Sequence, residues 1–192
     1  KYILLKMRVG IILYPGSNCA EDMKRYFESF HDTCFYIWHK CDNIDEFDFD
    51  LLVIPGGFAF GDRYYENATD NYILNPGIMA KESPVSKIIR DAAERKKVIL
   101  GVCNGFQILI QMKLLEGELV KNKDNKFTCA KVKCNIESNI LPHYKNNKVE
   151  LDVANSFGNY RTKYNSNYLL DSHQVFLTYA DENYSKNING SM

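Results

Sequence analysis

Apolar and polar positions alternate in blocks along the first 115 residues of the chain. Four apolar runs predict buried strands, because they hold aliphatic, β-branched or aromatic residues and stop at turn-forming ones: 7–14, 33–39, 49–58 and 98–102. Three intervening segments carry apolar residues at helical spacing and predict helices: 20–30, 83–97 and 105–112. Since strands without polar interruptions are buried on both faces, this order predicts an α/β fold with an open, doubly wound, mostly parallel sheet.

The pattern changes after residue 115. Short alternating segments separated by Asn, Lys and Gly predict antiparallel strands added to the sheet. Before that point, residues 64–83 are polar and irregular, and we expect an elaborated loop there. A chain of 192 residues is long enough for one well-buried core, so we expect a single domain over residues 1–192.

Composition narrows the classes of function. Lys plus Arg and Asp plus Glu number 24 each, so no global charge favours nucleic acid or an anionic membrane. No apolar stretch is long enough to span a membrane, and the six cysteines lack the spacing of a disulfide framework or a zinc site. We therefore expect a cytoplasmic protein without a metal, whose substrate or partner is recognised by local geometry.

Three predicted strands end in distinctive turns, P-G-S-N (15–18), P-G-G-F (55–58) and G-V-C-N-G (101–105). In open parallel sheets, ligands bind outside the carboxyl ends of the strands. The three turns should therefore meet at one edge of the sheet, and we expect the functional site at that edge.

The third turn has the pattern of a nucleophile elbow in which cysteine is the nucleophile. Gly101 and Gly105 allow a close approach of strand and helix, and the turn should strain Cys103. The N-terminus of the following helix should lower the pKa of the Cys103 thiol. The backbone N–H of Asn104 would face a developing oxyanion, and Gly57 in the P-G-G-F turn is a candidate second donor. The alternative interpretation is that Cys103 is a small core residue packed between glycines.

Gln107 favours the functional interpretation of this turn. It lies one helical turn beyond Cys103 and Asn104, on the same face of the predicted helix. Because the surrounding run F-Q-I-L-I is otherwise apolar, the Gln107 amide requires a partner, which could be backbone, water or a bound substrate.

Several motifs together carry a resemblance to a known family. G-V-C-N-G-F-Q (101–107) and P-G-G-F-A-F-G-D (55–62) are similar to the class I glutamine amidotransferases. More narrowly, the chain resembles the family of glutaminase subunits of phosphoribosylformylglycinamidine synthase through further motifs in the same order and spacing: Y-P-G-S-N-C (14–19), L-L-E-G-E-L (114–119), F-T-C-A-K-V-K (127–133) and N-x-N-G-S (187–191). The resemblance extends from Met7 to Met192.

This resemblance implies a role for each candidate site residue. Cys103 would attack the side-chain amide of glutamine, form a thioester and release ammonia. Gly57 and Asn104 would form the oxyanion hole, and Gln107 would hold the amino-acid end of the substrate.

The resemblance also implies partners. The ammonia would pass to a synthetase subunit, which converts formylglycinamide ribonucleotide to formylglycinamidine ribonucleotide with ATP and Mg²⁺ bound there. No cofactor is expected in this chain, and a small accessory subunit of the same complex is a further candidate partner.

The sequence departs from the family's pattern in two places. The family's catalytic His-x-Glu pair near the C-terminus is absent from these 192 residues, so we expect the chain as printed to hydrolyse glutamine slowly. Residues 155–160 read N-S-F-G-N-Y where the family has a loop with His and Glu. Of the remaining histidines, we interpret His173 as an ordinary residue of a predicted strand and His143 as a solvated loop residue.

Two alternative functions remain from the sequence. A catalytically silent glutaminase-like module would bind the synthetase without hydrolysing glutamine, and both departures favour it. A stand-alone cysteine hydrolase would need a base elsewhere in the chain, and Gln107 and the P-G-G-F turn argue against it.

Overall fold

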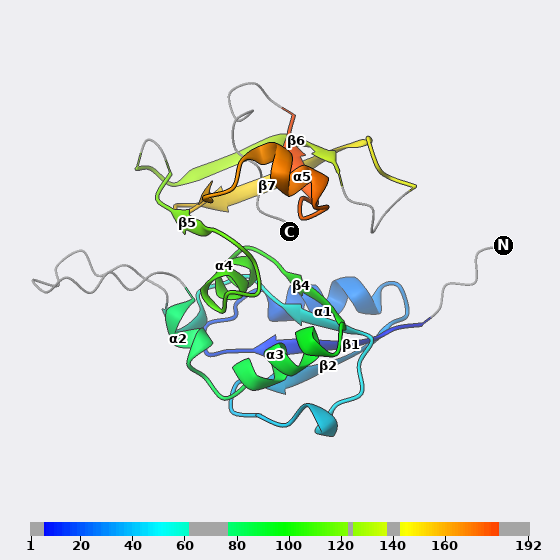
Figure 1. Ribbon diagram of the computed structural model, residues 1–192. Coiled ribbons are helices and arrows are strands. Elements are labelled where there is room, and N and C mark those ends of the chain that lie inside the picture. The colour runs from blue at the N-terminus through cyan, green and yellow to red at the C-terminus, as the bar shows by residue number, and fades with distance from the viewer. Residues whose placement is uncertain (1–5, 62–76, 123–124, 138–142, 181–192) are drawn as a thin grey trace, which may run out of the picture. The chain divides into compact units, whose positions relative to one another are not determined.

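The computed structural model describes residues 6–61, 77–122, 125–137 and 143–180 (Figure 1). The chain divides after Leu114 into two compact units. Within the described ranges, no helix combines the length and the apolar character needed to cross a bilayer. The single domain expected from chain length stays a prediction.

The first unit holds a parallel sheet with strand order β2-β1-β3-β4. Its elements are, in chain order, β1 (Arg8–Leu13), α1 (Ala20–Glu28), β2 (Thr33–Trp38), the 3₁₀ turn η1 (Ile44–Glu46), β3 (Leu51–Ile54), the 3₁₀ turn η2 (Ala59–Gly61), α2 (Ile78–Lys81), α3 (Ser86–Glu94), β4 (Val98–Gly101) and α4 (Asn104–Gln111). Right-handed crossovers leave β1 and β3 in opposite directions across the sheet, which places α1 and α3 on opposite faces (Figure 1). The predicted doubly wound α/β fold is therefore confirmed.

Apolar side chains of the strands pack on both faces of this sheet. On the α1 face, Val9, Ile11 and Val53 form a cluster that includes Phe27 of the helix. The four central residues of β1 are buried, as the unbroken apolar run at 7–14 predicts for a strand inside a parallel sheet.

All four strands and all three helices predicted for this unit are present. The third strand is shorter than the apolar run at 49–58, because its pairing ends at Ile54 and the chain turns at Pro55. The short helix α2 was not predicted, and it lies at the end of the segment expected to be an elaborated loop. Residues 62–76, most of that segment, lie outside the described residues.

The described residues of the second unit form antiparallel strands and one short helix: β5 (Glu118–Val120), β6 (Thr128–Ile136), β7 (Lys148–Asn155), β8 (Asn159–Arg161), α5 (Ser166–Asp171) and β9 (Leu177–Tyr179). The antiparallel strands predicted after residue 115 are thereby confirmed. β5 pairs with β8, and β6 pairs with both β7 and β9. These pairings form one two-stranded and one three-stranded antiparallel sheet within the described residues of the second unit.

The side-chain pattern of β7 is typical of a strand in an antiparallel sheet. Its residues alternate between exposed and half-buried along the whole strand, so β7 has a single apolar face. That face packs with Val132, Cys134 and Leu177 around a small core of its own.

Two histidines of the second unit can be placed. His173 occupies a turn after α5 with a φ of 58°, so the prediction that it lies in a strand is wrong. The sequence H-Q-V-F-L-T indicated an extended segment that begins at His173. Because the backbone of His173 is left-handed, the strand begins later, at Leu177. His143 is exposed in a turn, as expected.

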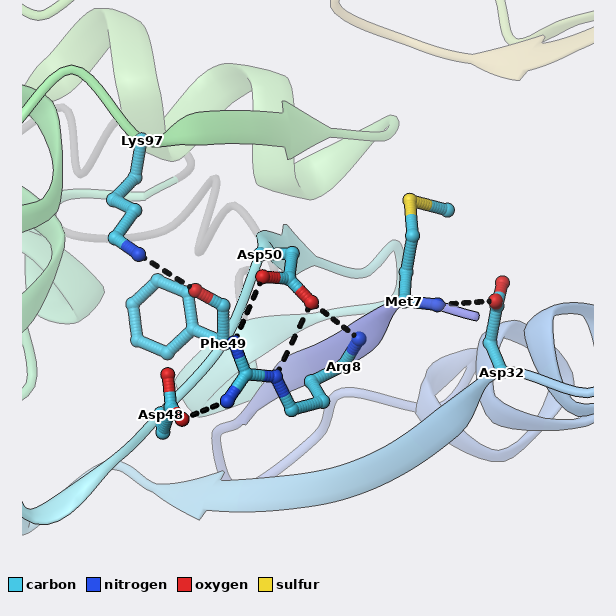
Figure 2. Close-up of polar contacts among 7 residues, drawn as sticks. All are labelled: Met7, Arg8, Asp32, Asp48, Phe49, Asp50 and Lys97. Atoms are coloured by element: carbon cyan, nitrogen blue, oxygen red, sulfur yellow. Dashed lines mark hydrogen bonds and ion pairs between the residues drawn. The ribbon is translucent and has the colours of Figure 1, made fainter. Parts of the chain in front are cut away.

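Polar contacts join the amino ends of all four strands of the parallel sheet (Figure 2). Arg8, the first residue of β1, forms ion pairs with Asp48 and Asp50, which immediately precede β3. The Arg8 guanidinium and backbone N–H both donate to Asp50 and hold the pKa of this carboxyl at about 2. Two further contacts reach the segments before β2 and β4: Met7 N–H to Asp32 Oδ1 at 2.9 Å, and Lys97 Nζ to the Phe49 carbonyl at 2.9 Å.

The lowered pKa of Asp50 predicts an acid-dependent contribution to stability. The Asp50 carboxylate stabilises the fold above the ordinary pKa of 3.8, and this contribution is lost as the pH falls towards about 2. Asp50→Asn should therefore have a lower free energy of unfolding than the wild type at pH 6, and the difference should disappear near pH 2. Urea unfolding across this pH range measures it, and Asp42→Asn, in an exposed loop, is the matched control. A difference that stays constant down to pH 2 would contradict the assignment.

Candidate active site

The three distinctive turns meet at the carboxyl edge of the parallel sheet, as predicted. The Phe58 N–H of the P-G-G-F turn donates to the Gly16 carbonyl of the P-G-S-N turn at 2.7 Å. One residue further on, the Ala59 N–H donates to Oδ1 of Asn104 in the elbow at 3.0 Å. The P-G-G-F turn is therefore hydrogen-bonded to both of its neighbours.

The elbow has the strained geometry that its sequence predicts. Cys103 has a φ of 54° and a ψ of −109°, a conformation that non-glycine residues adopt rarely, and it immediately precedes α4. A side chain at Gly105 would collide with the carbonyl oxygen of Ile54 in β3, and a Cβ at Gly101 would lie 2.8 Å from the Gly105 carbonyl. The two glycines therefore bring helix and strand close enough to project Cys103 out of the turn, where it is exposed.

Two backbone N–H groups, from Asn104 and Gly57, donate to the Cys103 thiol. The two donors come from different turns and act on the same sulfur. Gly57 has a φ of 130°, and a Cβ there would lie 2.5 Å from the Asn18 nitrogen. Only glycine can therefore present its N–H at this position.

The net effect of this environment on the thiol is opposite to the sequence-based prediction. Burial raises the pKa of Cys103, although both N–H groups act to lower it as expected. The residue is exposed as a whole, but the surrounding turns remove enough water from the sulfur for desolvation to dominate. Nearby Cys19 raises the pKa further.

Gln107 finds a partner that sequence reasoning missed. Its Oε1 accepts a hydrogen bond from Nδ2 of Asn104 at 3.0 Å. From the sequence, only the backbone of Asn104 was expected to have a role, yet its side chain is buried and bonded at both ends. The spacing of three residues between two amides on one helix was the available signal.

Cys19 is a second residue that sequence reasoning did not place in the site. Both cysteines lie against Gly56: a Cβ built on this glycine would lie 3.3 Å from Cys103 Cβ and 3.7 Å from Cys19 Sγ. All six cysteines carry free thiols. Among the described residues, no group of three His, Cys, Asp or Glu side chains is arranged to hold a metal ion, and the expectation of a metal-free chain stays a prediction.

A hollow lies beside these turns. Its volume is about 540 Å³, and it is lined by both the P-G-S-N and P-G-G-F turns and by η2: Pro15, Gly16, Asn18, Phe58, Phe60 and Gly61. It is open to solvent and mostly apolar, and Cys103 is not among its lining residues. The site therefore combines an exposed thiol, two converging N–H donors and an adjacent open surface.

The altered loop at 155–160 is held by the side chain of Asn122, a residue of the same unit. Oδ1 of Asn122 accepts from the Gly158 N–H at 2.9 Å, and its Nδ2 donates to the Asn155 carbonyl at 2.9 Å. The Asn122 amide thus holds this loop at its first residue and again at Gly158.

Comparison with known proteins agrees with this geometry. Residues 6–192 match the CobB/CobQ-like glutamine amidotransferase domain. The chain therefore belongs to this family of glutamine amidotransferases, as its motifs predicted.

The relatives within this family are more specific. The phosphoribosylformylglycinamidine synthase subunit PurQ of Pseudothermotoga lettingae is 35% identical over 184 residues, which cover 92% of this chain and 72% of that subunit. PurQ of Thermotoga maritima is 35% identical over 193 residues, with coverage of 97% and 78%. The predicted similarity to the glutaminase subunits of that synthase is confirmed.

Solved structures show the same fold. A chain of the PurLQS structure from Thermotoga maritima superimposes with a TM-score of 0.77 at 31% identity, over 97% of this chain and 84% of that one. A GMP synthase subunit from Thermoplasma acidophilum shares the fold with a TM-score of 0.50 at 18% identity, over 80% and 66% of the two chains.

The raised pKa of Cys103 predicts how its reactivity depends on pH. Only the thiolate reacts with iodoacetamide, so the alkylation rate of Cys103 should reach half its maximum at a higher pH than that of N-acetylcysteine. Peptide mass spectrometry after timed labelling measures the rate at Cys103 separately from the other cysteines. A midpoint at or below that of N-acetylcysteine would show that the N–H donors outweigh desolvation.

Proposed function

We propose that this chain is the glutaminase subunit of a phosphoribosylformylglycinamidine synthase, with Cys103 as its nucleophile. One observation supports the site assignment above all: two N–H groups from separate turns converge on a strained, exposed cysteine. Such a pair is the arrangement that stabilises the oxyanion of an acyl-transfer intermediate.

In the first step, the Cys103 sulfur attacks the side-chain carbonyl carbon of glutamine. The carbonyl oxygen becomes an oxyanion, which the N–H groups of Gly57 and Asn104 stabilise. The bond from carbon to nitrogen then breaks, the nitrogen takes up the proton that the thiol has lost and leaves as ammonia, and a thioester remains. Water attacks the thioester, the carbon–sulfur bond breaks, and glutamate and the free thiol are formed.

The raised pKa of Cys103 requires that this thiol lose its proton during substrate attack. Burial raises the pKa of Cys103, which favours its neutral thiol form before the substrate binds. The hydrogen bonds from the two N–H donors become stronger as negative charge develops on the carbonyl oxygen. They therefore stabilise mainly the transition state.

Gln107 is the proposed contact for the amino-acid end of the substrate. It lies one helical turn from Cys103 and is only partly buried. A hydrogen-bond partner at this distance distinguishes glutamine from a bare primary amide, because it adds binding energy remote from the reacting carbon.

The proposed partner is a synthetase subunit that consumes the ammonia. The PurQ relatives are named as subunits of phosphoribosylformylglycinamidine synthase, and the superimposed structure is titled PurLQS. By this kinship the ammonia aminates formylglycinamide ribonucleotide in purine biosynthesis, and ATP and Mg²⁺ bind to the partner. A small accessory subunit belongs to the same proposal, as does a cytoplasmic location.

A chloroketone analogue of glutamine tests the proposed nucleophile. Its ketone occupies the place of the substrate amide, and alkylation forms a sulfur–carbon bond with loss of chloride. We expect one adduct, on Cys103, that excess glutamine prevents, and labelling at background in Cys103→Ala. Cys129→Ala, which removes another exposed cysteine, is the control and should label like the wild type. Intact-mass and peptide mass spectrometry give the readout.

The proposal would be wrong if the adduct formed on a different cysteine, or if glutamine failed to protect Cys103. Either result would favour a glutaminase-like module without a glutamine site.

A further inference from the structure

Asn104 is the most fully bonded side chain at the elbow. It is only 3% exposed, and its amide is used at both ends. Oδ1 accepts the backbone N–H of Ala59 at 3.0 Å, and Nδ2 donates to Oε1 of Gln107 at 3.0 Å. Side chain and backbone of this one residue therefore contact the P-G-G-F segment, the thiol and Gln107.

The bond from Ala59 determines which atom of each amide donates and which accepts. A backbone N–H can only donate, so the group facing Ala59 must be the oxygen of Asn104. The NH₂ of Asn104 then faces Gln107, which must present its own oxygen in return. The NH₂ of Gln107 is thereby directed away from Asn104, as a donor for a ligand that accepts hydrogen bonds. A carboxylate, such as that of an amino acid, is the matching group.

The same bond determines the position of the second oxyanion donor. Ala59 lies two residues beyond Gly57, whose N–H points at the Cys103 sulfur. The opposite side of this segment is bonded to the P-G-S-N turn. Towards the elbow, its start is held by the bond from the Val102 N–H to the Ile54 carbonyl at 3.1 Å, and its far end by the bond to Asn104. Because the backbone N–H of Asn104 is the other donor, its side chain acts directly on the separation of the two donors at the far end of the segment.

We propose that the Asn104 side chain is a positioning residue for the glutaminase reaction. It holds the Gly57 donor in register with its own N–H, and it orients the Gln107 amide towards the carboxylate of the substrate. This assignment rests on the function proposed above. It predicts two separable effects, one on the rate of reaction at Cys103 and one on the binding of the substrate.

Two variants separate these effects. Asn104→Ala removes both hydrogen bonds, whereas Asn104→Asp keeps the oxygen that Ala59 needs and loses the donor to Gln107. Gln111→Ala, at the other end of α4, is the matched control. Labelling of Cys103 by the chloroketone analogue at several concentrations gives a maximal rate and a half-saturating concentration. The iodoacetamide rate at the same pH corrects each maximal rate for thiolate content, and thermal unfolding checks the fold.

For Asn104→Ala, we expect the corrected maximal rate to fall about tenfold or more, and the half-saturating concentration to rise about tenfold. Asn104→Asp should show the rise in half-saturating concentration with a corrected maximal rate within about threefold of the wild type, since the tether to Ala59 persists. Gln111→Ala should match the wild type in both.

The outcomes distinguish this inference from the proposed function. If the wild type is not labelled, or is labelled without protection by glutamine, the function fails. If the wild type is labelled and protected while both Asn104 variants match it, the positioning role is overturned. A folded Asn104→Asp that loses maximal rate as fully as Asn104→Ala would also overturn it, and this variant decides the matter if Asn104→Ala does not fold.

Discussion

The hydrogen bond from the Ala59 N–H to Oδ1 of Asn104 is the constraint on which the candidate site depends. It joins residues 45 positions apart in the sequence and is buried. Such a bond adds about 1 kcal/mol to stability, but leaving the Ala59 N–H without its acceptor would cost about 1–3 kcal/mol. This bond therefore favours one position of the P-G-G-F turn against the elbow and contributes to the separation of the two N–H donors beside Cys103.

The two edges of the parallel sheet have different roles: contacts at one edge stabilise the fold, and the turns at the other edge form the candidate site. At the amino ends of the strands, exposed ion pairs such as that of Arg8 with Asp50 join segments that contribute no residue to the candidate site. At the carboxyl ends, the turns carry the strained Cys103 and the glycines that let backbone approach backbone. Strain of this kind persists only where the surrounding packing determines it, and the buried central residues of β1 and the fully buried β3 supply that packing.

Much of this arrangement could be predicted from the sequence. Gly101 and Gly105 on either side of a cysteine predicted the elbow, and the parallel sheet predicted that the three turns would meet. Both predictions depend on local spacing and on the direction of strands, which sequence patterns report directly. The strands after residue 115 were predicted as antiparallel from their alternating pattern, but which strand pairs with which required the structure.

The remaining features depend on distances between segments that are remote in the sequence. The bond between Asn104 and Ala59, and the proximity of Cys19 to Cys103, join different strand ends whose spacing no motif gives. The direction of the thiol pKa shift was predicted wrongly because a helix N-terminus is visible in sequence, whereas desolvation of a sulfur is not. Where a local electrostatic effect competes with burial, the structure decides which is larger.

The role of Cys103 as the nucleophile can be tested by trapping the covalent intermediate itself. The chain is mixed with glutamine, denatured in acid within the first turnover, and analysed by peptide mass spectrometry. We expect a γ-glutamyl thioester on Cys103 and on no other cysteine, lost on treatment with hydroxylamine. A γ-glutamyl adduct on Cys19 or another cysteine, with Cys103 unmodified, would contradict this role.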